Sequence, residues 1–399
     1  MNLQNKRWLF LKKKWVLAAV SAMLLASGCA PALQNDDEVT QENGDETTAV
    51  IPTYQISENF YRTIVPFEPG KARGLVVSNL NTRHDIVEFE TGLMRIAQEN
   101  FSPESFFFQE GQVLEEGVVR SWLSRKYTDA QLKEQELTAE ENLGLNPVDS
   151  GEGSVDERNE RAPIYLAHIM EQDYLTKKED NSLQLDGVVI GLALNSVHYY
   201  QKEAYGAQYE FTIPDEKIEE EGKKMAAQVA SRLRSMDKTK NIPVTIALFQ
   251  QAPQNSVTAG NFIAYTHLDA GDGEISDWKA IDEEYVLFPS STAEENHRED
   301  STYFANFKQD IETYFDNFNG VIGRGLYSGE ELTGLKIEIP IQFYGKAEAI
   351  GFTQYVTGLV MEHFPAYIPV EVSITSTSGT EALIVKEANA EEPYVHIYE

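Results

Sequence analysis

Two groups of polar side chains have residue types that could bind or transform a small molecule. In the first group, Arg83, His84, Asp85, Glu88 and Glu90 follow one another closely. His84 and Glu88 lie four residues apart and would share one face of a helix, as a general acid–base pair requires. The simpler interpretation, which we favour, is a helix start with Asp85 at its cap or first turn and Glu88 favourable to the helix dipole.

The second group follows a segment that is typical of a buried strand, Gly187–Val197 (GVVIGLALNSV). It combines aromatic rings with hydrogen-bonding groups: Asn195, Ser196, His198, Tyr199 and Tyr200. Strand ends of this kind often line clefts for ligands such as sugars or peptides. A structural turn with half-buried tyrosines is the alternative. We therefore predict a candidate ligand cleft that joins this group to Arg83 and His84.

Other kinds of chemistry find no support in the sequence. It contains no His-Glu-x-x-His motif, no Gly-x-Ser-x-Gly elbow and no phosphate-binding loop. No two of the seven histidines lie three or four residues apart, so a metal pair on a helix is not expected. We predict no catalytic residue, no metal ion and no cofactor. The alternative is a cell-envelope hydrolase that uses carboxylates such as Glu88 or Glu90 as general acid and base.

The first 28 residues predict export from the cell. Five cationic residues precede an almost wholly apolar run, Trp15–Ser27. That run would span about 20 Å as a helix, against roughly 30 Å of bilayer hydrocarbon, so it is too short for a stable transmembrane helix. A short apolar core with a cationic flank and small residues at its end is typical of a cleavable signal peptide, which we place at residues 1–28.

The only cysteine, Cys29, follows this segment directly. Leu25–Cys29 (LASGC) resembles a lipobox, in which small residues precede a cysteine that is diacylated and becomes the first residue, although Ala26 stands where Leu is most common. Two acyl chains anchor a protein durably, whereas one gives marginal binding. We predict anchoring to the extracellular face of the cell membrane through diacylglyceryl on Cys29. An ordinary secretory signal with an incidental cysteine is the alternative.

The chain is strongly acidic, with 33 Lys and Arg against 64 Asp and Glu. Removal of residues 1–28 takes away five basic and no acidic residues, so the net charge falls from −31 to −36. Such a surface repels nucleic acid and anionic lipid head groups, and neither is expected as a direct partner. Residues 29–57 are polar and acidic after the cysteine, and we predict a lipidated Cys29 followed by a disordered tether.

From residue 58 onward the apolar pattern is that of a globular protein. Helical spacing predicts helices at 85–100, from Asp215, at 301–317 and at 346–363. Apolar runs predict strands at 74–77, from 106, and at 187–197, 210–213, 244–249, 334–343 and 370–374. The segment 138–161 has almost no apolar pattern, and we predict that it is a mobile surface excursion.

An order of helix, strand, helix and Ile-Pro-Val strand occurs twice, which suggests duplication. The closest match is between Asn241–Ile246 (NIPVTI) and Tyr367–Val372 (YIPVEV). Chance recurrence of a simple pattern is the alternative. We predict an α+β fold of two related units, each a mixed sheet with amphipathic helices packed mainly on one face. The first unit is placed at 58–253 and the second at 254–399, with the linker at 252–261.

Three strings resemble the CamS family, the sex-pheromone lipoprotein precursors of Gram-positive bacteria: Val65–Leu75 (VPFEPGKARGL), Arg83–Met94 (RHDIVEFETGLM) and Ala193–Tyr200 (ALNSVHYY). The resemblance covers nearly all of residues 15–399. It implies a surface lipoprotein without an established biochemical activity, whose signal peptide can supply a hydrophobic pheromone-like peptide. The corresponding residues here are Ser21, Ala22, Met23, Leu24, Leu25, Ala26 and Ser27. They end in the Leu-Ala-Ser of the family's peptide, but the earlier residues differ, and signal debris without a receptor is the alternative.

These observations lead to two functional hypotheses. The first is a membrane-anchored, non-catalytic protein that binds an unknown ligand at the cell surface and whose signal yields a pheromone-like peptide. The second is the carboxylate hydrolase named above. A deep pocket with converging carboxylates favours the enzyme, and a shallow aromatic groove favours binding.

Overall fold

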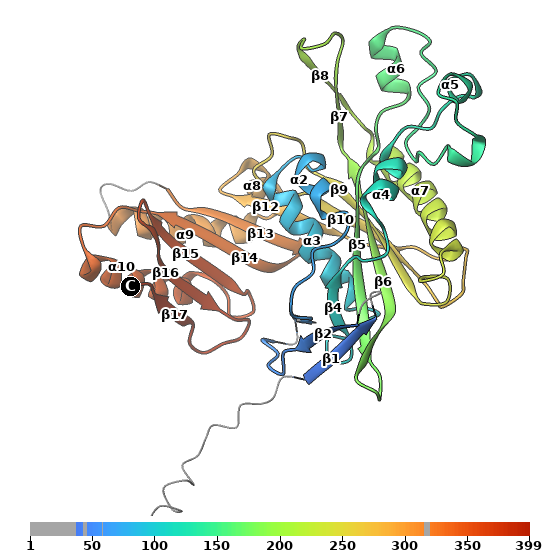
Figure 1. The fold of residues 1–399 in the computed structure, drawn as a ribbon. Helices are drawn as coiled ribbons and strands as arrows, with labels where there is room; N and C mark the ends of the chain where they lie inside the picture. Colours follow the sequence, from blue (N-terminus) through green and yellow to red (C-terminus); the bar gives the residue numbers. More distant parts are fainter. Residues whose placement is uncertain (1–36, 43–45, 58, 315–319) are drawn as a thin grey trace, which may run out of the picture.

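A computed structural model describes residues 37–42, 46–57, 59–314 and 320–399. These residues form two mixed sheets with helices packed on them, which is the predicted α+β class (Figure 1). The predicted signal peptide, its pheromone-like segment and Cys29 lie outside the described residues. No helix among the described residues is both long enough and apolar enough to cross a membrane.

The first sheet has the strand order β11-β10-β9-β6-β5-β4-β3, with β1 paired to β6 and β2 paired to β1. Its strands are β1 (Asp37–Glu42), β2 (Glu46–Ile51), β3 (Arg62–Thr63), β4 (Phe107–Glu110), β5 (Leu166–Lys177), β6 (Ser182–Asn195), β9 (Val244–Gln251), β10 (Asn261–Leu268) and β11 (Lys279–Ala280). A separate hairpin, β7 (Val197–Gln201) and β8 (Gln208–Thr212), projects from the end of β6 (Figure 1).

The helices of the first unit lie on both faces of its sheet. They are η1 (Arg73–Leu75), α2 (Val76–Asn79), α3 (Arg83–Ala97), α4 (Glu116–Leu123), α5 (Asp129–Glu134), η2 (Ala139–Glu141), α6 (Val155–Arg161) and α7 (Asp215–Ser235). Helix α3 packs Phe89 against Phe249 on one face, whereas α4 and α7 pack against Ile190 and Leu248 on the other. The unbroken apolar run in β6 accounts for this, because a strand covered on both faces loses its polar alternation.

The segment 74–77 was predicted as a strand, and that prediction is wrong. The residues form η1 and the start of α2, with Leu75 and Val76 buried. A run of four apolar residues cannot distinguish a strand from a buried helical turn, because both bury every side chain.

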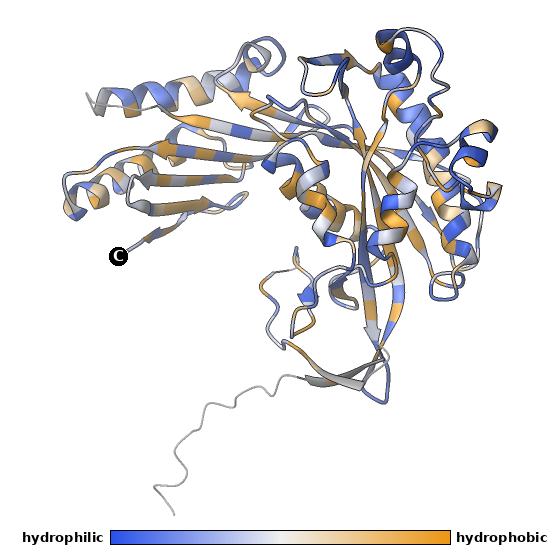
Figure 2. Cartoon of the chain, turned by 45° about the horizontal axis from the view of Figure 1, so that its top comes forward, coloured by the Kyte–Doolittle hydropathy of each residue, from blue (hydrophilic) through white to orange (hydrophobic). Residues whose placement is uncertain are grey.

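The second sheet has the order β12-β13-β14-β15-β16-β17. Its elements are β12 (Glu283–Phe288), α8 (Ser291–Asn296), α9 (Arg298–Tyr314), β13 (Ile322–Ser328), β14 (Glu331–Pro340), α10 (Lys346–His363), β15 (Val370–Ser376), β16 (Gly379–Lys386) and β17 (Tyr394–Ile397). Strand β14 alternates buried and exposed residues, and one core holds Phe307 of α9 together with Phe352 of α10. Figure 2 shows hydrophobic and hydrophilic residues interleaved along these strands and helices.

The two sheets repeat one topology. Strands β4, β5, β6, β9, β10 and β11 correspond in order and direction to β12 through β17. Among these six strands of each sheet one neighbouring pair is parallel, β6–β9 in the first and β14–β15 in the second. The chain between the two strands of each pair contains a long helix, α7 or α10. The register agrees as well, since Val188 N–H donates to Pro243 O and Leu335 N–H donates to Pro369 O. The two Ile-Pro-Val strands are therefore equivalent elements of related units.

The division between the units lies further along the chain than predicted. The predicted linker 252–261 is the connection from β9 to β10, and β10 pairs with β9 inside the first sheet. Phe262 is fully buried in the first unit's core. The boundary at residue 253 is therefore corrected to the short stretch between β11 and β12. The Pro, Asn and Gly content of 252–261 is typical of a domain boundary. In the structure these residues instead form a loop between two neighbouring strands of one sheet.

The predicted disordered tether also needs correction in its second half. Strands β1 and β2 form an antiparallel hairpin that joins the first sheet alongside β6. Val39, Ala49 and Ile51 are buried with Leu183 in a small core. A few apolar residues at two-residue spacing suffice to bury one face of a hairpin, although the composition around them is acidic.

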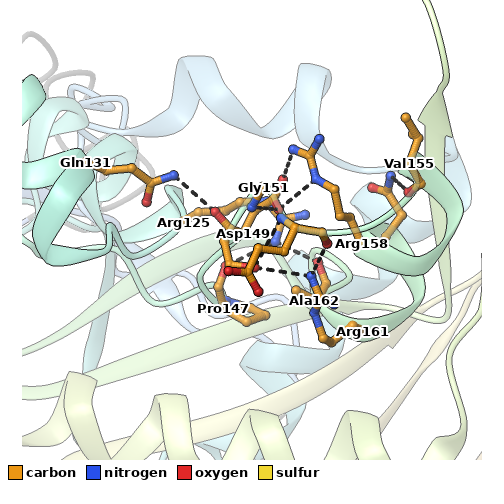
Figure 3. Close-up of polar contacts among 12 residues, drawn as sticks. Arg125, Gln131, Pro147, Asp149, Gly151, Val155, Arg158, Arg161 and Ala162 are labelled. Atoms are coloured by element: carbon orange, nitrogen blue, oxygen red, sulfur yellow. Dashed lines mark hydrogen bonds and ion pairs between the residues drawn. The ribbon is translucent and has the colours of Figure 1, made fainter.

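The excursion 138–161 contains regular structure despite its lack of apolar residues. A capping box between Ser154 and Glu157 begins α6. Arg158 binds the carboxylate of Asp149, and this bond lowers the pKa of Asp149 to about 2. Arg125 reaches in from outside the segment to donate to the carbonyl oxygens of residues 147 and 162 (Figure 3). Polar contacts, which hydrophobic periodicity does not reveal, hold this segment to the first unit.

Candidate functional site

A pocket of about 130 Å³ lies at one edge of the first sheet. Strand β4 pairs with β5 as far as Glu110 opposite Gln172, and Gly111 N–H then donates to Glu171 O. Beyond this point the edge of β5 faces the pocket instead of another strand of the sheet. We call it the β5-edge pocket. It is lined by Gly70, Ala72, Arg73, Val76, Ile86, Glu90, Phe108, Glu110, Gly111, Leu114, Val119, His168, Ile169, Met170, Glu171 and Gln172.

The loop before η1 forms one wall of the pocket, and Glu110 holds it there. The Glu110 carboxylate accepts a hydrogen bond from Gly70 N–H at 2.6 Å and forms an ion pair with Arg73. Lys71 N–H donates to Gly111 O at 3.1 Å. The loop is therefore fastened to the end of β4 by both side-chain and backbone contacts. Gly70, Lys71 and Arg73 belong to the first string that resembles the CamS family, at 65–75, so these contacts give that string a structural role.

Glu171 builds the opposite wall. Its carboxylate accepts hydrogen bonds from Val113 N–H at 2.8 Å and Leu114 N–H at 2.6 Å, in the loop that leads to α4. The backbone of Gly111 passes so close that an added Cβ would lie 2.5 Å from Cβ of Glu171. Only glycine fits at that point of the loop. Glu171 thus fixes the chain on the side of the pocket nearest α4.

Asp173 lies two residues after Glu171 in β5 and on the same face of that strand. It is 2% exposed, and its Oδ2 accepts a hydrogen bond from Gln112 N–H at 2.8 Å. Its Oδ1 is buried without a hydrogen-bond partner in the described part of the chain. Burial, together with the negative charge of Glu171, raises the pKa of Asp173 well above its ordinary value. This carboxyl group therefore favours its protonated form more than an exposed aspartate does.

His168 contributes a polar group to the interior of the pocket. It is 1% exposed, and burial lowers its pKa to about 4, so the ring is neutral near pH 7. Its Nδ1 lies 3.5 Å from Nδ2 of Asn79. A hydrogen bond from Asn79 to Nδ1 leaves the proton of the neutral ring on Nε2. That Nε2 has no partner among the described residues.

Glu90 and Gln172 complete the polar lining on the side of α3. Gln172 Nε2 donates to the backbone O of Glu90 at 2.9 Å, and Gln172 Oε1 accepts from the Tyr174 hydroxyl. Both polar ends of Gln172 are thus used within the protein. Within the described residues the Glu90 carboxylate, by contrast, takes part in no hydrogen bond or ion pair. In the lining, the Glu90 carboxylate and His168 Nε2 are therefore polar groups that no hydrogen bond or ion pair within the described residues occupies.

The first predicted group of residues forms a helix start, as the simpler interpretation held. Thr82 caps α3, since its side chain accepts from Asp85 N–H. Asp85 is fully buried and accepts from Ala252 N–H and Gly260 N–H, which ties the helix to the β9–β10 loop. Glu88 binds Arg95 and Tyr285. The carboxylate that would have paired with His84 for catalysis is therefore already occupied.

The predicted ligand cleft at the end of β6 stays a prediction. Asn195 donates to Ile164 O and accepts from Gln251, and the Ser196 hydroxyl donates to Gln251 O. Asn195 also lines an open hollow of about 440 Å³. In the described part of the chain, no hydrogen bond or ion pair joins these residues to Arg83, which is exposed, or to His84, which is partly buried.

The aromatic members of that group belong to the β7–β8 hairpin. His198 contacts Asn159 at 2.8 Å and stacks on Tyr200. The Tyr200 hydroxyl donates to Asp156, whereas the Tyr199 hydroxyl accepts from Gln254 N–H. These contacts use most of the polar groups that were expected to face a ligand.

The sequence pattern did not indicate the residues of the β5-edge pocket, apart from Glu90. It predicted no strand at 166–177, where His168, Glu171, Gln172 and Asp173 lie in the sequence LAHIMEQDYLTK. Polar residues inside an otherwise apolar strand were the available signal, because buried polar groups require a structural or functional reason.

Comparisons with known proteins agree with the CamS resemblance. The family described as "CamS sex pheromone cAM373 precursor" matches residues 67–392. A sex pheromone precursor from Lactobacillus salivarius subsp. salivarius UCC118 is 34% identical, with a TM-score of 0.78 over 87% of this chain and 98% of that chain. The C-terminal domain of the sex pheromone staph-cAM373 precursor from Staphylococcus aureus is 33% identical, with a TM-score of 0.71 over 80% of this chain and 98% of that chain.

No curated protein matches the sequence. The family match nevertheless includes most strands of both sheets, and the two solved structures are almost entirely covered by this chain. The resemblance stated from the three strings is therefore confirmed, and the chain belongs to the CamS family of sex pheromone precursors.

Proposed function

We propose that this protein is an extracellular lipoprotein that binds a small apolar ligand, or the apolar end of a larger one, in the β5-edge pocket. The observation that carries the proposal is the pocket itself, whose apolar walls surround a few fixed polar groups, as in most small-molecule sites. Its volume of about 130 Å³ is below the roughly 300 Å³ at which drug-sized ligands are usually accommodated. The ligand must therefore be small or enter by one end.

The hydrogen bonds of the lining support binding rather than hydrolysis. Glu110 is engaged by Gly70 and Arg73, and Glu171 by two backbone N–H groups. A carboxylate acting as general acid or base needs free access to the proton it transfers. Of the pocket's three glutamates, Glu90 alone has a free carboxylate within the described residues. One available carboxylate can orient a ligand, but an acid–base pair of carboxylates requires two.

Anchoring through diacylglyceryl on Cys29 belongs to the same proposal. The test is mass spectrometry of the N-terminal peptide of the full chain, expressed in a Gram-positive host, beside a Cys29→Ser variant. We expect cleavage before residue 29, a diacylglyceryl group on Cys29 and membrane association that the variant loses. An unmodified Cys29 in membrane-associated protein would contradict anchoring while leaving the binding proposal intact.

Release of a pheromone-like peptide from residues 21–27 is also part of the proposal. Synthetic SAMLLAS is added to a recipient strain that responds to CamS peptides, with a scrambled peptide as the control. Induction by SAMLLAS alone supports a signalling role. Equal responses to the two peptides over a wide concentration range would show that the segment is a by-product of signal-peptide cleavage without a receptor.

Ligand binding is tested by thermal unfolding of residues 30–399, which contain the four hydrophobic cores seen among the described residues. Small apolar compounds should raise the midpoint, because a ligand at one hundred times its Kd adds about 2.7 kcal/mol to the free energy of unfolding. Ala72→Leu, which adds bulk at the pocket wall, is the matched variant. The midpoint of thermal unfolding of this variant should be the same with and without ligand. If no compound stabilises the original chain, the binding proposal is wrong.

A further inference from the structure

We infer that the ligand presents a positively charged primary amine to Glu90 from an apolar body held in the β5-edge pocket. This inference rests on the proposed binding function and specifies the chemistry of the ligand. It depends on three independent features of the pocket: an available carboxylate, a buried hydrogen-bond donor and the apolar walls between them.

The available carboxylate is that of Glu90, which lies on α3 and lines the pocket. Its backbone O is held by Gln172, so this turn of the helix is fixed against β5. The Glu90 side chain is partly exposed, so a ligand can reach its carboxylate. Within the described residues no cation or donor binds this carboxylate, and a ligand ammonium group would therefore pair with it without displacing a protein partner.

The second feature is His168, a residue almost completely removed from solvent that nevertheless faces the pocket. Its Nδ1 faces Asn79, which leaves Nε2–H as a donor without a partner in the described structure. Such a donor selects an acceptor oxygen on the ligand, such as a carbonyl or hydroxyl oxygen. His168 is neutral near pH 7, so it supplies no charge that would attract an anion.

The balance of charges decides the sign of the ligand. The pocket has three carboxylates, on Glu90, Glu110 and Glu171, against one guanidinium, on Arg73, which is already paired with Glu110. Such a site repels carboxylates and phosphates and attracts ammonium groups. The remaining wall is aliphatic and aromatic, with Val76, Ile86, Phe108 and Met170 among its residues.

Two sources share this chemistry. A free aliphatic amine offers the charge and the apolar body. The amino-terminal residue of an apolar peptide offers in addition a carbonyl oxygen for His168. The volume of the pocket admits one such end and leaves the rest of a longer molecule outside.

The experiment is isothermal titration calorimetry at pH 7 with five probes against residues 30–399. Hexylamine, hexan-1-ol and hexanoate have one chain length and differ in charge. Leucyl-leucine amide and its N-acetyl derivative test the amino end of a peptide. Glu90→Gln is the informative variant, and Glu99→Gln, an exposed glutamate in the turn after the same helix, is the control.

We expect hexylamine to bind about tenfold or more tightly than hexan-1-ol, with hexanoate weakest, because a hydrogen bond to a charged group contributes that much. Glu90→Gln should abolish the preference for the amine and leave hexan-1-ol binding unchanged, whereas Glu99→Gln should change neither. Stronger binding of leucyl-leucine amide than of hexylamine, lost on acetylation, identifies a peptide terminus as the source. Weaker binding of leucyl-leucine amide than of hexylamine identifies a free aliphatic amine as the source.

Equal affinity for the amine and the alcohol, or a preference that survives in Glu90→Gln, would overturn the inference while the proposed binding function stands. Absence of binding by all five probes would overturn both. Circular dichroism of each variant shows whether its fold is retained. His168→Leu, which removes the donor, is a second variant in case Glu90→Gln does not fold, and it should weaken binding of the dipeptide amide more than binding of hexylamine.

Discussion

At the scale of single residues, Asp173 is a carboxyl group almost completely removed from water. It is buried beside the Glu171 carboxylate, with one oxygen bonded to Gln112 N–H and the other without a partner among the described residues. A carboxyl group with a raised native pKa holds a proton that the unfolded chain has released. Its contribution to stability is therefore full below about pH 3.9 and is lost as the pH rises through the native pKa.

We accordingly predict that Asp173→Asn becomes progressively more stable than the original chain as the pH rises from 4 to 8. The amide is nearly isosteric, cannot ionise, and can donate to Glu171 while it still accepts from Gln112. The difference in the free energy of unfolding between Asp173→Asn and the original chain should grow by up to about 1.4 kcal/mol per pH unit until the native pKa of Asp173 is reached. Urea unfolding at several pH values measures it, with exposed Asp277→Asn as the control. A constant difference across this range would show that Asp173 is ionised in the folded protein.

The residues of the site were only partly predictable from the sequence. Glu90 and Asp85 were singled out because they lie in a short polar string on a helix that hydrophobic spacing reveals. His168 and Glu171 could not be assigned to the pocket, since their roles depend on where β4 ends and on which loop crosses β5. Those facts are set by pairing between segments some sixty residues apart, which periodicity within one segment does not report.

At the scale of elements, the two units differ in how closely helices and loops approach equivalent strands. Gly187 directly precedes the residue that bonds to Pro243, and Gly334 directly precedes the one that bonds to Pro369. A Cβ on Gly187 would lie 2.2 Å from the ring of Phe101, whereas a Cβ on Gly334 would meet nothing within 4 Å. The equivalent glycines therefore have different reasons to be glycine.

We predict that Gly187→Ala lowers the free energy of unfolding by about 1–3 kcal/mol, because Phe101 must leave its packed position. Gly334→Ala, its equivalent in the second unit, should change stability by less than about 0.5 kcal/mol. Denaturant titration of both variants gives the comparison. Similar losses at the two positions would show that glycine serves the strand itself rather than the contact with Phe101.

Hydrophobic spacing predicted several of the long elements and their types, although it missed β5. Helices α3 and α10, and the strands that follow the two Ile-Pro dipeptides, are where the pattern placed them. The failures have a common physical cause. At 74–77 a short apolar run had no period, and at 37–51 a few apolar residues lay among many acids. In both cases contacts with distant parts of the chain select the structure.

At the scale of the whole molecule, one polar cluster joins the two units. Arg95 of α3 binds Glu88 at 2.8 Å and Glu283 of β12 at 2.7 Å. The Tyr285 hydroxyl donates to the other oxygen of Glu88, and burial together with the charge of Glu88 raises the pKa of Tyr285 well above its ordinary value. Glu88 was considered above as a catalytic carboxylate, but its contacts make it part of the junction between the sheets.

We predict that Arg95→Met weakens this junction, because it leaves Glu88 and Glu283 near the interface without their cation. Removal of one partner from a fully buried pair costs roughly 3–5 kcal/mol. The Arg95 side chain is 37% exposed, so we expect a smaller loss, about 2 kcal/mol.

Arg120→Met is the matched control, since Arg120 pairs with Glu116 on the surface at 63% and 49% exposure. Its loss should stay below about 1 kcal/mol. Because the junction couples two sheets that have separate cores, calorimetry of Arg95→Met should also show a broader transition or two transitions. If Arg95→Met unfolds in one sharp transition with the stability of Arg120→Met, apolar contacts rather than this cluster hold the two units together.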